Sequence, residues 1–221
     1  MSALDALSQL QQLLMSVHGV EESADARDYL VGAAFQQRHA PQASADEALL
    51  VSEKGDELHV GLFLGEPILA QLSRGPDAPW TQERLRAFCA AAEGVSHFLY
   101  LLHRARARRP VSQLEMEAQG ELDKYLSVLL QLWAVGRRNG SARLRHLLFD
   151  RAKLRAGLDA AERERYRLAS ALAAACARAL EARYVLQGRL DGLLREVRRL
   201  YRLGGGEKLS AFAQGQVAWA A

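Results

Sequence analysis

The stretch TQERLRAFCAAAEGVSHFLYLLHRARAR, residues 81–108, decides the fold class of this chain. Thr81 is a favourable helix N-cap, and the arginines of the last turn suit the negative end of a helix. The middle of the stretch, residues 88–102, is apolar on almost every side, which is typical of a helix buried inside a helical body. Pro110 ends the pattern. We therefore expect a long central helix.

Helical patterns continue on both sides of this stretch. Apolar residues spaced three or four apart from Leu4 to Val17 predict an amphipathic helix that ends near Gly19. Two pairs have the spacing of a capping box, Ser112 with Glu115 and Asp159 with Glu162, and each predicts the start of a further helix. Additional helices are expected over residues 25–35, 141–155 and 191–203, with a final helical turn over 208–213.

One segment has the pattern of β-structure. Apolar residues alternate with polar ones before and after a turn at residues 53–56, which predicts a hairpin over 48–64 with one buried face. A lone hairpin is marginally stable in water. It is therefore expected to pack on helices or to find a third strand, from this chain or from a partner.

Together these patterns predict a mainly α (α+β) protein: a helical bundle body with one β-hairpin in the N-terminal part. Glycine and proline at residues 75–79 mark a boundary. The predicted division is a small acidic region over 1–79, of net charge −8, and a basic all-helical body over 80–221, of net charge +11.

Composition restricts the class of protein. The 221 residues are 49% hydrophobic and 25% charged, which excludes a disordered chain, and no apolar stretch has the length of a membrane span. No basic residue precedes Arg27, so a secretory signal is not expected. The two cysteines, Cys89 and Cys176, lack the spacing of a metal or redox motif and are expected to be reduced thiols in the core. We expect a cytoplasmic protein.

Two pairs of polar residues stand out within the helices. Glu93 and His97 are four residues apart and share one face of the central helix; Glu117 and Glu121 repeat the spacing in the next helix. If the two helices form a hairpin, one imidazole and three carboxylates converge, which are the ligand types of four-helix carboxylate metalloproteins. Those proteins place Glu and His three apart on each of two helices, so the match is partial.

Two interpretations of these four residues stay open. They could hold a divalent metal, Fe, Mn or Zn, or act as an acid/base pair in a helical enzyme. They could equally form a buried ion-pair network in which the glutamates pair with Lys124, His97 or an arginine. Structural networks are the commoner case, so we expect no cofactor, with a divalent metal as the alternative.

Basic residues concentrate in the second half of the chain. Many have an acid three or four residues away, as on a solvated helix surface. Five further bases form an expected phosphate-binding strip: Arg143, Arg145, Arg151, Lys153 and Arg155. No helix-turn-helix, aromatic RNA-binding pattern or zinc finger accompanies the strip, so nucleic-acid binding is an alternative that is not favoured.

The leading functional hypothesis is a non-enzymatic interaction or regulatory protein. It would bind another protein, or a second copy of itself, through its helical surface or the edge of the hairpin. The alternatives are the metal-dependent or acid/base enzyme centred on Glu93 and His97, and nucleic-acid binding through the arginine-rich strip. The sequence leaves open whether the protein is an enzyme.

Overall fold

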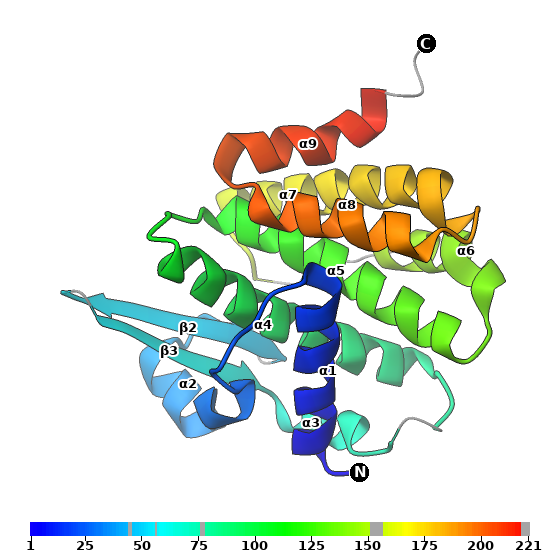
Figure 1. The fold of residues 1–221 in the computed structure, drawn as a ribbon. Helices are drawn as coiled ribbons and strands as arrows, with labels where there is room; N and C mark the ends of the chain where they lie inside the picture. The colour runs from blue at the N-terminus through cyan, green and yellow to red at the C-terminus, as the bar shows by residue number, and fades with distance from the viewer. Residues whose placement is uncertain (44–45, 56, 76–77, 151–156, 218–221) are drawn as a thin grey trace. The chain divides into compact units, whose positions relative to one another are not determined.

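A computed structural model of the chain describes residues 1–43, 46–55, 57–75, 78–150 and 157–217. Helices dominate these residues, and a small sheet lies in the N-terminal part, which confirms the predicted fold class (Figure 1). None of the helices described combines the length and the apolar character that crossing a membrane requires.

By packing, the chain divides into two compact units. The first comprises residues 1–16 and 20–103, and the second residues 17–19 and 104–221. This division falls within the central helix, whereas the predicted boundary at residue 79 rests on charge and on breaker residues. The boundary at residue 79 stays a prediction.

The first unit combines helices with the sheet. Its elements are α1 (Ala3–His18), a 3-10 turn η1 (Ala26–Tyr29), β1 (Leu30–Val31), α2 (Ala33–His39), β2 (Glu47–Lys54), β3 (Glu57–Leu64), α3 (Glu66–Leu72) and α4 (Gln82–Arg106). The last residues of α1 and α4 belong to the second unit.

The sheet has the strand order β1-β3-β2. Strands β2 and β3 form the predicted antiparallel hairpin, in a register that places Val51 opposite Val60. The third strand comes from this chain, because Leu30 and Val31 pair in parallel with Leu62 and Phe63.

The helix expected over residues 25–35 is therefore wrong. Asp25 caps only a single 3-10 turn by accepting a hydrogen bond from the Arg27 backbone N–H, and the chain then extends along β3. Pairing with the buried half of β3 supplies backbone hydrogen bonds there, and this tertiary contact overrides the local helical pattern. Helix α2 begins only at Ala33.

The core of the first unit lies between α1, α4 and β3. It contains Leu7, Leu10 and Leu14 of α1, Ala91, Val95 and Phe98 of α4, and Leu62 and Leu64 of β3. The spacing of the leucines predicted α1, whereas the stretch over residues 88–102, apolar on almost every side, predicted α4.

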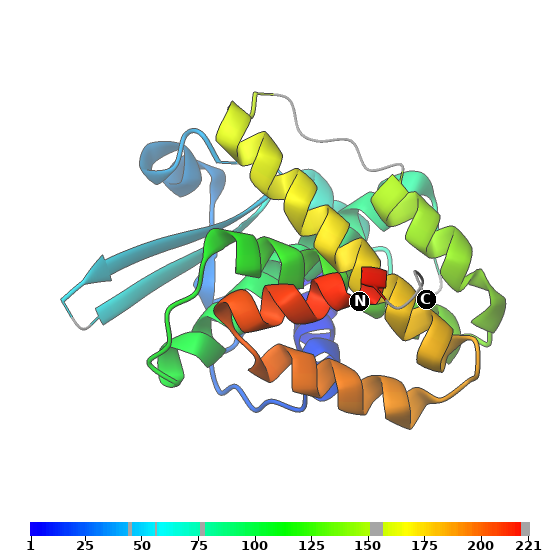
Figure 2. The ribbon, with the colours of Figure 1, turned by 90° about the horizontal axis from the view of Figure 1, so that it is seen from above.

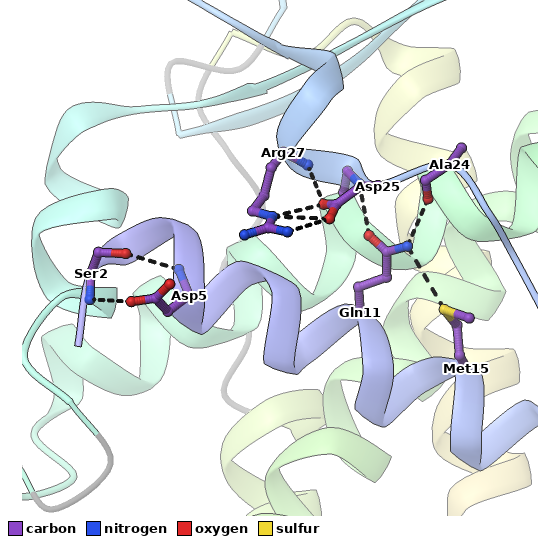
Figure 3. A network of polar contacts seen from close by, with 8 residues as sticks. Ser2, Asp5, Gln11, Met15, Ala24, Asp25 and Arg27 are labelled. Carbon is purple, nitrogen blue, oxygen red and sulfur yellow. Dashed lines mark hydrogen bonds and ion pairs between the residues drawn. The ribbon is translucent and has the colours of Figure 1, made fainter.

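Polar contacts hold the segment after α1 onto that helix (Figure 3). The buried Gln11 side chain donates to the Ala24 carbonyl at 2.8 Å and accepts from the Ala26 N–H at 2.7 Å. Ser2 and Asp5 bond reciprocally at the start of α1, and hydrogen bonds from Ser2 hold the pKa of Asp5 below its usual value.

The second unit is helical in the residues described. Its elements are α5 (Gln113–Ala134), a 3-10 turn η2 (Arg138–Gly140), α6 (Ser141–Arg145), a π-helical turn η3 (His146–Asp150), α7 (Ala160–Leu180), a second π-helical turn η4 (Glu181–Val185), α8 (Leu190–Arg202) and α9 (Gly205–Val217). Helix α7 packs between α5 and α9, and Figure 2 shows α9 lying across α7.

Small residues let these helices approach closely. Ala169, Ala173, Cys176 and Leu180 form a buried stripe along α7. Both cysteines are free and buried. Helix α9 is longer than the expected final turn over 208–213, because it begins at Gly205 and continues to Val217.

The predicted N-caps are confirmed. The hydroxyls of Thr81 and Ser112 accept hydrogen bonds from the backbone N–H three residues later, and Asp159 with Glu162 forms a complete capping box. Of the helix expected over 141–155, residues 151–155 lie outside the described part of the chain, and the rest forms α6 and η3.

Candidate functional site

His97 and Glu93 lie on α4 in the first unit, His97 buried and Glu93 half-buried. A residue that the sequence did not single out reaches the imidazole from β2: the Glu47 Oε1 atom lies 3.7 Å from His97 Nδ1. Gly94 allows this approach because it has no side chain. A Cβ at this position would lie 3.0 Å from Glu47 Cγ, which is closer than such atoms normally pack. The geometry thus gives the buried His97 a half-buried carboxylate neighbour from another element.

Glu117 and Glu121 lie on α5 in the second unit, both half-buried. The Lys124 Nζ atom donates to Glu121 Oε1 at 2.8 Å, so Glu121 has the ion pair that the network interpretation expects. Because the two predicted pairs belong to different units, the four-residue metal site stays a prediction.

Two members of the arginine strip are described, and they differ. Arg143 is exposed on α6. The Arg145 Nε atom instead donates to the buried Glu181 carboxylate at 3.0 Å, and is therefore engaged in an ion pair within the protein. Arg151, Lys153 and Arg155 lie outside the described residues. Nucleic-acid binding through the strip stays a prediction.

A buried polar cluster in the second unit escaped the sequence reasoning. We call it the Asp123 cluster; its members, each at most 6% exposed, are His18, Arg104, Glu115, Gln119, Asp123, Tyr201 and Lys208. They come from the end of α1, the end of α4, and from α5, α8 and α9. Glu115, Gln119 and Asp123 recur every four residues and so share one face of α5, but the other four members lie far away in the chain and leave no spacing signal.

The carboxylate of Asp123 is central to the acidic side of this cluster. His18 Nε2 lies 2.9 Å from Asp123 Oδ1, and the Gln119 amide donates to the same oxygen at 2.9 Å. The His18 ring also stacks on Tyr201, with 3.9 Å between the ring centroids. These contacts fix the end of α1 against α5 and α8.

Lys208 is a basic residue of the Asp123 cluster. Its side chain is fully buried, and Nζ lies 5.3 Å from the centre of the Tyr201 ring and 5.8 Å from that of Phe212. Burial lowers the pKa of Lys208 to about 7, although the nearby carboxylates of Asp123 and Glu115 oppose the shift. The Arg104 guanidinium, 3.9 Å from Glu115, adds to the lowering.

The chemistry of the Asp123 cluster is that of an internal network. Its basic and acidic groups compensate one another, and the near-complete burial of all seven side chains leaves them no exposure through which to meet a substrate. Perturbed ionisable groups at catalytic sites are characteristically placed in a cleft. We therefore assign this cluster to the stability of the second unit.

The hairpin presents a different kind of surface. Its turn end, residues 51–54 and 57–60, is named the ribbon here, and Figures 1 and 2 show it extending away from the rest of the first unit. Strand β1 pairs only with Leu62 and Phe63. Among the residues that the structure describes, both edges of the ribbon therefore lack a neighbouring strand.

One face of the ribbon is mostly apolar, with Glu53 opposite Leu58. The register places Val51 beside Val60, and Leu58 follows on the same face. Val60 reaches the core of the first unit, whereas Val51 is 44% exposed. An apolar strip thus continues from the core onto the exposed part of the hairpin.

Comparison with protein-family models, with curated proteins and with solved structures finds no match for this chain. Its function must therefore be inferred from its own residues.

Proposed function

We propose that this is a cytoplasmic, non-enzymatic interaction protein that binds an extended segment of a partner protein along its ribbon. The observation that carries the proposal is that neither edge of the ribbon has a neighbouring strand in the described part of the chain, beside an apolar strip ending at the exposed Val51. Free backbone groups along an edge bind an added strand, and the alternating side chains select its sequence.

The stability of the ribbon supports the same function. Two strands without a third are marginally stable in water, and β1 covers only the buried half of β3. A partner strand would complete the sheet and bury Val51. The mixed charges of the ribbon, among them Glu53, Lys54 and Glu57, favour a partner segment that alternates apolar and charged residues.

The test uses peptides selected against the whole protein from a random displayed library. Their affinity for the protein and for Val51→Asp is measured by fluorescence anisotropy. We expect Val51→Asp to weaken binding by about tenfold, because the variant loses the binding free energy that burying one valine side chain contributes. The control is Val135→Asp, because Val135 is a similarly exposed apolar residue, 66% exposed, at the end of α5 in the second unit; this variant should bind as the unaltered protein does.

A second measurement tests strand addition itself. Methylating the backbone nitrogens of a selected peptide one at a time should abolish binding at every second position, because only alternate N–H groups of a strand face its neighbour. Binding that tolerates methylation at all positions, or that Val51→Asp leaves unchanged, would exclude the ribbon as the binding site.

A second candidate function is metal or acid/base chemistry at His97. The observation that favours it is Glu47, which adds a half-buried carboxylate to an imidazole already flanked by Glu93 along α4. Metal per chain is measured by elemental analysis of protein purified without an immobilised-metal column. Stoichiometric Fe, Mn or Zn that is lost in both His97→Ala and Glu47→Gln would support this function.

The opposite result assigns the pair to stability. Metal-free protein of full helicity, in which His97→Ala lowers the free energy of unfolding by on the order of 2 kcal/mol, would identify Glu47 and His97 as a structural pair. The ribbon proposal does not depend on this outcome.

A further inference from the structure

The turn between α7 and α8 holds two leucines at the surface. Leu186 is 71% exposed, the largest exposure among the large apolar side chains described, and Leu190 is 38% exposed. They are four residues apart. Leaving such side chains in water forgoes the stabilisation that their burial would give.

The backbone of this turn is well fixed. The Leu186 N–H donates to the Glu181 carbonyl at 3.0 Å, and the Arg189 N–H donates to the Tyr184 carbonyl at 2.9 Å. Gly188 adopts a φ of 65°, a left-handed conformation that favours glycine. The exposed Leu186 side chain therefore stands on a hydrogen-bonded turn, and Figure 2 shows the turn that joins α7 to α8.

The surface around the leucines is basic. Residues 183–202 hold six arginines against two acids. Arg183, Arg189 and Arg195 are exposed, and the Arg189 guanidinium lies 5.9 Å from the centre of the Tyr184 ring. Of the acids, Glu196 is engaged with Arg199 at 2.8 Å. We call Leu186, Leu190, Arg183, Arg189 and Arg195 the Leu186 patch.

We infer that the Leu186 patch docks the protein on a lipid bilayer that carries acidic headgroups, a function beyond the binding of a partner strand. Leu186 and Leu190 would insert among the acyl chains near the headgroups, while the arginines bind lipid phosphates. Membrane binding strengthens with the apolar area inserted and with the attraction of basic side chains to acidic lipids, and this patch offers both.

The exposed leucines favour lipid over nucleic acid. A phosphate backbone would bind the arginines, but most protein contacts to it are polar and it offers no place to bury an aliphatic side chain such as Leu186. An acidic bilayer offers phosphates to the arginines and an apolar interior to the Leu186 side chain at the same time. The absence of a membrane-spanning helix among the described residues is compatible with attachment at the surface.

The first test is co-sedimentation with vesicles of phosphatidylcholine mixed with phosphatidylglycerol, against vesicles of phosphatidylcholine alone. We expect binding to the mixed vesicles that weakens as salt is added, because salt screens exposed charges. Leu186→Asp should reduce this binding by about tenfold or more. Val135→Asp, at a comparably exposed apolar residue outside the patch, should not change it.

A second pair of variants separates charge from insertion. Arg183→Glu with Arg195→Glu should reduce binding to the mixed vesicles only. A cysteine placed by Leu186→Cys can be labelled selectively with an environment-sensitive nitrobenzoxadiazole dye, because both natural cysteines are buried. Its fluorescence should rise on mixed vesicles, whereas the same label introduced by Val135→Cys should not respond.

Three results would overturn the inference. They are no binding to mixed vesicles at low salt, equal binding by Leu186→Asp, and binding of duplex DNA through the same arginines without binding of vesicles. The last result would assign the arginines to nucleic acid. Each variant changes an exposed side chain, so circular dichroism should show native helicity throughout.

Discussion

In the first unit, the close approach of two elements can depend on a single residue, and Gly94 is the clearest case. It lies on the face of α4 where the start of β2 and the side chain of Leu62 arrive. The missing side chain is what lets Glu47 approach His97. A glycine inside a helix reduces helix stability, so its place here is explained by packing.

The prediction is that Gly94→Ala destabilises the protein. The added Cβ would lie 2.9 Å from Leu62 Cδ1 and 3.0 Å from Glu47 Cγ, so β2 or its side chains must shift. We expect a loss of about 1–3 kcal/mol in the free energy of unfolding, as for other overpacked sites, measured by chemical denaturation.

Gly206→Ala is the matched control, since a Cβ at Gly206 would meet no atom within 4 Å. That variant should be neutral or slightly more stable, because alanine favours a helix. Equal stability of the two variants would show that α4 and β2 do not pack closely at Gly94.

At the scale of elements, local signals at the helix ends determine where a helix begins. The start of α7 is set by Asp159, which accepts from the Glu162 N–H at 2.8 Å, while Glu162 accepts from the Asp159 N–H at 2.9 Å. Both partners lie within one turn, which is why the sequence revealed this boundary.

Asp159→Ala should shorten α7 from its first turn. Removing the cap leaves backbone N–H groups without an acceptor, and we expect a cost of about 1 kcal/mol in chemical denaturation. Glu164→Gln, which breaks an exposed ion pair with Arg167 in the same helix, should cost less than about 0.5 kcal/mol. If Asp159→Ala is as stable as Glu164→Gln, the capping box does not define the start of α7.

For the molecule as a whole, the Asp123 cluster links stability to pH. The folded protein holds Lys208 at a pKa of about 7, whereas the ordinary value for the unfolded chain is 10.5. Between these values the unfolded chain binds a proton that the folded protein lacks. The free energy of unfolding therefore rises with pH over this window, and the contribution is constant below it.

We expect a rise of about 2 kcal/mol between pH 7 and 9, measured by chemical denaturation, that is absent in Lys208→Met. The comparison stops at pH 9, because burial raises the pKa of Cys176 to about 12 and thereby opposes the rise at higher pH. Lys54→Met, at an exposed lysine of the hairpin, should keep the rise. An identical pH profile in Lys208→Met would exclude Lys208 as its source.

The sequence by itself determined the elements whose signals are local. Apolar spacing predicted the first helix, a stretch that is apolar on almost every side predicted the central helix, and alternation predicted the hairpin. Thr81, Ser112 and Asp159 marked where helices begin. Each signal operates within one or two turns, so no knowledge of the rest of the chain was needed.

Only the tertiary structure decided which distant residues meet. Strand β1 exists because β3 offers Leu62 and Phe63 as partners, which no pattern in residues 25–35 could show. The Asp123 cluster joins His18, Asp123 and Lys208 from the two ends and the middle of the chain. Glu47 likewise reaches His97 only once β2 packs on α4. Such contacts depend on the folded path of the chain, because burial and proximity, not spacing, bring these side chains together.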